Sequence, residues 1–143
     1  MYPPLVCTYV PYYVRCFVKN VNIVLFQFVL VTEKYTWTQA QEYCESKYRG
    51  LVQMLDEGYQ RALNDLLRSV PTATVWLGGN VEPDGSLFWA MGQNRQLANY
   101  QNWYDGYPQK EPNIQCLVTS YSIFSKMMHV DCNGFNLSFV CVE

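Results

Sequence analysis

Six cysteines constrain the fold of this chain more than any other feature of its sequence. Their number is even for a chain of 143 residues, no Cys-x-x-Cys pair occurs, and His129 is the single histidine. Zinc sites and thiol-redox motifs need such pairs or several histidines, so neither fits the pattern. We therefore expect three disulfides formed in an oxidising compartment, although the sequence alone leaves their pairing open.

Charge and composition exclude several kinds of partner. Ten basic and twelve acidic residues give a formal net charge of -2, which provides neither a footprint for nucleic acid nor a polybasic membrane patch. Half of the residues are apolar, enough for a packed core, and the length corresponds to one domain spanning residues 1–143.

Two N-terminal segments bear on membrane insertion and secretion. Met1 to Pro4 has no basic start and no leading apolar stretch, so we expect no signal peptide in this chain. The apolar run from Val21 to Val31 is too short to span a bilayer, and we interpret it as a buried strand or hairpin.

Hydrophobic periodicity predicts two helices set among strands. β-branched and aromatic residues indicate β structure over residues 1–31. A first helix is capped by Thr36 or Thr38, with Gln39 or Glu42 completing a capping box, and it ends at Gly50. Asp56 caps a second helix over residues 57–69. Further strands are expected over residues 51–55, 75–78, 88–89, 117–124, 127–130 and 138–142.

A set of short motifs accompanies the cysteines after the first helix begins. Their order and spacing resemble the C-type lectin-like domain, in a long form with three disulfides that is similar to secreted C-type lectins of fish and invertebrates. The resemblance runs from Cys7 to Glu143, with the run from Val21 to Val31 as an unmatched surplus. The motifs are Trp37-Thr38-Gln39-Ala40 before Cys44, Val75-Trp76-Leu77-Gly78-Gly79, Asn102-Trp103, Glu111-Pro112-Asn113 before Cys116, and Phe139-Val140-Cys141 after Cys132.

The resemblance implies an α+β fold of two helices and two small antiparallel sheets, with a long ligand-presenting loop at about residues 90–115. It also implies a secreted or extracellular protein that is not an enzyme. Structureless stretches of this length inside compact domains are usually functional. The implied disulfides join Cys7 to Cys16, Cys44 to Cys141 and Cys116 to Cys132.

Sugar-binding members of the family hold calcium in the long loop, and Glu111-Pro112-Asn113 has the sequence of one of their ligand motifs. In the family that motif begins about four residues after the tryptophan, whereas Glu111 follows Trp103 by eight. Counting from Trp103, the matching positions are Tyr107-Pro108-Gln109, and counting back from Cys116 puts Ile114 at the acidic-ligand position. We therefore interpret the tripeptide as shifted out of register.

The other half of the family's calcium site departs further. The family has Trp-Asn-Asp starting five residues before its second-last cysteine, and here Met127-Met128-His129 precedes Cys132. Calcium takes about six to eight oxygen ligands, so methionine sulfur and a neutral imidazole are poor substitutes. Asp131 lies next to the cysteine, out of register. We predict no cofactor, with calcium on Glu111 and Asn113 as the alternative.

The remaining candidates for ligand contact are polar and aromatic residues of the loop. Tyrosine together with asparagine and glutamine is typical of recognition surfaces, whereas the resemblance implies that Trp76 and Trp103 lie in the core. Nothing around His129 resembles a nucleophile elbow or a metal triad, and no spacing of carboxylates in the chain indicates a catalytic pair. We therefore expect no catalysis. The candidate ligand-binding residues are Tyr104, Tyr107, Gln109, Glu111, Asn113 and His129.

Three functions are compatible with the sequence. The first is a non-enzymatic recognition module that binds a glycan or an extracellular protein through the long loop without calcium. The second is a calcium-dependent, mannose-type lectin that uses Glu111 and Asn113. The third is an ice-binding or structural secreted protein, suggested by Gln93, Asn94, Gln96, Asn99, Gln101 and Asn102.

The sequence indicates no oligomeric state. Asn136-Leu137-Ser138 is an N-glycosylation sequon.

Overall fold

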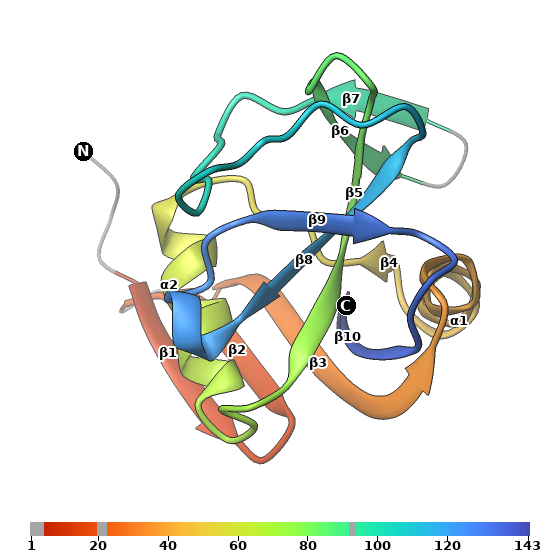
Figure 1. Cartoon of the computed structure of the whole chain (residues 1–143). Helices are drawn as coiled ribbons and strands as arrows, with labels where there is room; N and C mark the ends of the chain where they lie inside the picture. The colour runs from red at the N-terminus through yellow and green to blue at the C-terminus, as the bar shows by residue number, and fades with distance from the viewer. Residues whose placement is uncertain (1–4, 20–22, 92–93) are drawn as a thin grey trace.

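The computed structural model describes residues 5–19, 23–91 and 94–143. Two helices, α1 (Trp37–Lys47) and α2 (Glu57–Leu67), pack beside a large sheet (Figure 1). A 3-10 turn, η1, covers Tyr121–Ile123. The strands are β1 (Leu5–Val10), β2 (Tyr13–Val18), β3 (Ile23–Tyr35), β4 (Gly50–Leu51), β5 (Thr74–Val81), β6 (Leu87–Met91), β7 (Asn94–Leu97), β8 (Gln115–Ser120), β9 (Met128–Asp131) and β10 (Leu137–Val142).

The strands form one connected, mixed sheet. Its main path is β1-β2-β3-β10-β5-β6-β7, while β4 pairs with β10 and β8 pairs with both β5 and β9. The predicted α+β fold with two helices is confirmed, and the two groups of mainly antiparallel strands are joined into one mixed sheet. The reason is a parallel pairing of β10 with β5, with Ser138 beside Val75 and Phe139 beside Trp76, which joins the two groups of strands.

The apolar surplus near the N-terminal end belongs to β3. This strand is thirteen residues long and pairs with β2 along residues 23–29 and with β10 along residues 28–35. Phe26, Phe28 and Leu30 are buried while the residues between them are less so, as the two-residue period of a strand requires. The strand therefore serves as the bridge between the N-terminal hairpin and the rest of the sheet. Val21 and Asn22 of the run, like Met1 to Pro4, lie outside the described residues.

Both helices begin where their cap residues predict. The Thr36 hydroxyl accepts a hydrogen bond from the backbone N–H of Gln39, and the Gln39 side chain accepts one from the backbone N–H of Thr36, which completes the capping box. Asp56 caps α2 by accepting from the N–H of Tyr59 at 2.9 Å. α2 ends at Leu67, two residues earlier than expected.

Two apolar clusters make up the core, and alternate residues of β5 point into different ones. Val75 and Leu77 belong to the cluster that packs under α2, whereas Trp76 belongs to the cluster around α1. Trp76 is fully buried, as predicted, and its indole N–H donates to the backbone oxygen of Tyr35 at 2.8 Å. The strand thus fixes both layers against the same sheet.

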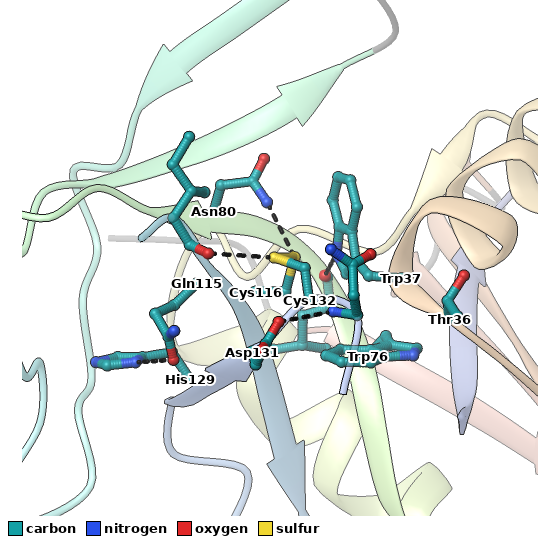
Figure 2. Close-up of a disulfide and its surroundings, with 12 residues drawn as sticks. Thr36, Trp37, Trp76, Asn80, Gln115, Cys116, His129, Asp131 and Cys132 are labelled. Carbon is teal, nitrogen blue, oxygen red and sulfur yellow. Dashed lines mark hydrogen bonds between the residues drawn. A yellow bond between two sulfur atoms is a disulfide. The ribbon is translucent and has the colours of Figure 1, made fainter. Parts of the chain in front are cut away.

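All three implied disulfides are present. Cys7–Cys16 crosses the β1–β2 hairpin, Cys44–Cys141 joins α1 to β10, and Cys116–Cys132 joins β8 to the residue after β9. The Cys116–Cys132 disulfide follows the long loop closely in the sequence, and Figure 2 shows its surroundings.

Three local expectations need correction. The segment after β6 turns back as β7, so the irregular loop covers residues 98–114 rather than 90–115. β4 is only two residues long, shorter than the strand expected over residues 51–55. The strand expected over residues 117–124 stops at Ser120, because the 3-10 turn η1 begins at Tyr121.

Candidate functional site

A histidine fastens the end of the long loop to β9. The backbone N–H of Gln109 donates to His129 Nε2 at 2.8 Å, and His129 Nδ1 lies 3.3 Å from Gln115 Oε1. Because Nε2 accepts, a neutral imidazole carries its proton on Nδ1, which then donates to Gln115. Both ring nitrogens are therefore engaged inside the protein. Figure 2 shows His129 and Gln115 beside the Cys116–Cys132 disulfide.

Burial keeps this imidazole neutral. His129 is 4% exposed, and the edge-on rings of Tyr107 and Trp103 lie at centroid distances of 5.0 and 6.1 Å. Burial lowers the pKa of His129 because the imidazolium would lose its hydration, while the carboxylate of Glu111 acts in the opposite direction. The neutral form is the one that can accept from the loop, so the pKa and the hydrogen bond favour the same state.

Three of the six candidate residues meet at this point. Tyr107 and Gln109 each contact His129, and the peptide bond between Tyr107 and Pro108 is cis. Glu111 is half-buried and near enough to His129 to influence its pKa.

The other two candidates point towards solvent. Asn113 is exposed. Tyr104 is 39% exposed, and its backbone N–H donates to the backbone oxygen of Met127 at 2.9 Å. The hydrogen bond therefore fixes the Tyr104 backbone to the residue before β9, while the Tyr104 ring is exposed to solvent.

The side chains around His129 are a poor donor set for calcium. Calcium takes about six to eight oxygen ligands, whereas the side-chain oxygens near His129 come from the Glu111 carboxylate and the Gln115 amide, beside an imidazole and the Tyr107 ring. Ile114 is 50% exposed at the position where the resemblance places an acidic ligand. Within residues 5–19, 23–91 and 94–143, no group of three or more His, Cys, Asp or Glu side chains could hold a metal ion. The residues present do not fit the family's ion.

A buried glutamine of α2 holds the base of the long loop. Gln60 Oε1 accepts from Asn102 Nδ2 at 2.7 Å and from the Tyr100 hydroxyl, and Gln60 Nε2 donates to the backbone oxygen of Phe124 at 3.0 Å. One side chain thus joins α2, the long loop and the β8–β9 connection. Gln60 and His129 together fix the two ends of the loop.

Gln60 and Gln115 are absent from the candidates chosen by sequence. Gln60 stands three residues before Leu63 and seven before Leu67, so it shares the inward stripe of α2, and that spacing was an available signal. Gln115 precedes Cys116 directly, and no local pattern connects it with a histidine fourteen residues further on.

A family model for the C-type lectin domain matches residues 33–143, most of the chain. The chain belongs to the C-type lectin domain family. Domains of this family bind glycans or proteins and are generally non-enzymatic. No curated protein sequence matches this C-type lectin domain significantly.

Solved structures share the fold of this C-type lectin domain at low identity. Human lithostathine matches with a TM-score of 0.68 and 22% identity, covering 95% of this chain and 86% of that one. A mouse scavenger receptor carbohydrate-recognition domain gives 0.69 and 21%, covering 85% and 91%. A calcium-independent type II antifreeze protein gives 0.67 and 17%, covering 100% and 98%. At these identities the similarity shows the fold and leaves the ligand to be argued from the site.

Two remaining features of this C-type lectin domain concern membrane spanning and the glycosylation sequon. In the described part of the chain, neither helix has the length and apolar character needed to cross a bilayer. Asn136 of the sequon is exposed just before β10, whereas the Ser138 hydroxyl is turned inward and donates to the backbone oxygen of Thr32 at 3.1 Å.

Proposed function

We propose that this domain is a non-enzymatic recognition module that binds a glycan or an extracellular protein through its long loop without calcium. The supporting observation is the engagement of His129, which stands where the resemblance places a calcium-ligating aspartate. Its two ring nitrogens bind the Gln109 N–H and the Gln115 amide. An imidazole that accepts from the loop backbone does in this domain what a bound ion would do, namely hold the loop end in place.

The loop composition supports a recognition role. Tyr104 is exposed and Tyr107 is half-buried, and exposed tyrosine beside amide side chains combines a rigid apolar face with adaptable hydrogen bonding. Such surfaces bind through a few aromatic anchors. We expect a secreted or extracellular location, consistent with the three disulfides.

Catalysis is not part of the proposal. A general base needs a free ring nitrogen directed at a substrate, and the accepting nitrogen of His129 is 2.8 Å from the backbone nitrogen of Gln109. His129 is the chain's single histidine. We therefore assign it a positioning role.

Calorimetric titration of calcium into the metal-free protein tests the calcium-independent part. We expect no heat of binding up to millimolar concentrations. Saturable one-site binding that disappears in a Glu111→Ala, Asn113→Ala variant would instead establish the mannose-type calcium lectin, and mannosides would be the next ligands.

Binding screens against glycan and extracellular-protein arrays in EDTA test the long loop. We expect Tyr104→Ala to remove the binding that the native domain shows. Tyr12→Asn is the matched control, because Tyr12 is also an exposed tyrosine and asparagine tolerates its left-handed backbone, φ 69°. Equal binding by both variants would place the ligand elsewhere.

The ice-binding alternative needs a flat array of polar side chains. Arg95 on β7 instead pairs with Glu82 and lies over the Phe88 ring at 4.2 Å, and Asn102 is turned towards Gln60. These contacts favour the recognition module. Gln93 of the expected array lies outside the described residues. Measurement of thermal hysteresis distinguishes an ice-binding protein from a recognition module.

A further inference from the structure

A cavity of about 350 Å³ lies between α2, the base of the long loop and the β8–β9 connection. Its walls include Gln60, Asn64, Tyr100, Asn102 and Phe124. None of these residues is a candidate contact of the long-loop site. The volume is at the lower end of the range for small-ligand sites, which corresponds to a single ring rather than an extended chain.

Phe124 at the cavity is held in an unfavourable arrangement. Its ring is 70% exposed, and its backbone has φ of 56° and ψ of 34°, the left-handed region that bulky side chains rarely adopt. Exposure of an aromatic ring and backbone strain both cost free energy, and their coincidence is typical of functional positions. The ring is therefore a candidate contact surface for a ligand.

Two polar residues of α2 keep Phe124 in that position. Gln60 Nε2 donates to the Phe124 backbone oxygen at 3.0 Å, and the buried Ser125 hydroxyl donates to Asn64 Oδ1 at 3.0 Å. The connection is thus bound to the helix on both sides of the peptide that follows Phe124. A site held by the framework in this way is preorganised, which lowers the entropic cost of binding.

Three charged residues of α2 also line the cavity, and each of them is already paired. Arg61 binds Glu57 at 3.1 Å, and Asp65 accepts from Arg68 and from the Tyr9 hydroxyl, each at 3.0 Å. The contact with Asp65, after burial, helps to raise the pKa of Tyr9 to about 12. With the charges engaged, the cavity offers mainly neutral amide groups, so its chemistry favours an uncharged polar ligand.

The amides themselves have hydrogen-bonding capacity to spare. Asn64 uses its carbonyl oxygen on Ser125, and Asn102 uses its amino group on Gln60. Among the described residues, the amino group of Asn64 and the carbonyl oxygen of Asn102 have no hydrogen-bonding partner of their own. One donor from α2 and one acceptor from the base of the long loop therefore remain at the cavity, and hydroxyl groups of a ligand can use both.

We propose that this cavity is a second, calcium-independent site that takes one neutral pyranose ring. The apolar C–H face of the ring packs on Phe124, and ring hydroxyls bind the Asn64 amino group and the Asn102 carbonyl oxygen. The site lies between α2, the β8–β9 connection and the base of the long loop. It is separate from the long-loop tip, so it does not depend on the function proposed above.

Amide-resolved NMR titration in EDTA tests this site with methyl glycosides of glucose, galactose, mannose and N-acetylglucosamine. We expect at least one glycoside to shift the Phe124 and Ser125 backbone signals and the Asn64 and Asn102 side-chain signals at millimolar concentrations. No shift at these positions with any of the four glycosides would overturn the proposal.

Variants of Phe124 make the test specific. Phe124→Gly removes the ring yet suits the left-handed backbone, so the domain should remain folded while affinity falls about tenfold or more. Phe124→Tyr should keep binding. Phe135→Ala is the matched control, because Phe135 is 50% exposed on the β9–β10 connection. Undiminished affinity in Phe124→Gly would contradict the assignment.

A variant of the long loop separates the two proposals. Tyr104→Ala should leave the glycoside shifts at Phe124 unchanged, whatever its effect on the binding expected of the loop. Loss of the Phe124 shifts in Tyr104→Ala would mean that the glycoside occupies the loop tip, and the cavity proposal would then fail while the loop proposal stood.

Discussion

The strands around β10 and the long loop of residues 98–114 are held by different forces. β10 pairs with three strands, fully buries Phe139, Val140 and Cys141, and carries a disulfide to α1. The loop depends on polar contacts from the framework, chiefly those of Gln60 at its base and His129 at its end. The difference shows how one domain can keep its fold while its long loop changes, since few residues determine the position of the loop.

The largest effect is expected from the disulfide that closes the framework. Cys44–Cys141 spans 97 residues and Cys7–Cys16 spans 9. In the chain-entropy model, replacing the long-range pair by alanines lowers the free energy of unfolding by about 4–5 kcal/mol, and the hairpin pair by about 2–3 kcal/mol. Denaturant unfolding of the two double variants measures this. Equal losses would show that loop length does not govern the framework's stability.

A single methyl group should test how closely the framework is packed. A Cβ at Gly78 would lie 2.7 Å from the backbone oxygen of Leu51, so β5 and β4 could not keep their present approach. We expect Gly78→Ala to lower the free energy of unfolding by about 3 kcal/mol. In Gly134→Ala the new Cβ would meet Asp131 at an ordinary 3.5 Å, and little change is expected. Thermal unfolding compares them.

Gln60→Ala should affect the loop more than the framework. It leaves Asn102 and Tyr100 without their acceptor, at a cost of about 1–2 kcal/mol. Hydrogen exchange should accelerate over residues 98–104 and change little in β10. Gln41 is an equally buried control whose side chain accepts from the backbone N–H of Leu51. Gln41→Ala should accelerate exchange at β4. The same exchange pattern in both variants would contradict the view that Gln60 specifically holds the loop.

The smallest effect should follow acidification. Because the folded-state pKa of His129 is lowered from 6.5, the unfolded chain takes up the proton first as the pH falls. The free energy of unfolding should therefore decrease from about pH 7 towards pH 5, and the decrease should be weaker in His129→Gln. Unfolding curves across this window measure it. The Tyr12→Asn variant keeps the histidine and should retain the native slope.

The framework was largely predictable from the sequence. Caps act within a few residues, so Asp56 identified the start of α2, and the choice of Thr36 or Thr38 located the start of α1 to within two residues. The disulfide pairing and the buried Trp76 followed from the resemblance to the family. Local patterns missed the parallel contact of β10 with β5, because it joins residues far apart in the chain.

The loop was predictable only in part. Counting from Trp103 selected Tyr107 and Gln109, and the structure places both against His129. β7 escaped notice because its four residues are all exposed and show no alternation of polar and apolar side chains. The contact between Gln109 and His129 joins residues twenty apart through a backbone group, and side-chain patterns carry no information about such a partner.

The central place of β10 in the sheet has a consequence for biosynthesis. It is the last strand of the domain to leave the ribosome, yet β3, β4 and β5 all pair with it. Until it arrives, the apolar edge of β3 stays open and the Cys44 thiol has no correct partner, while Cys116 and Cys132 are already within reach of exchange. The Cys44–Cys141 bridge and the pairing of β10 with its three neighbours can therefore form only after the whole domain has been synthesised.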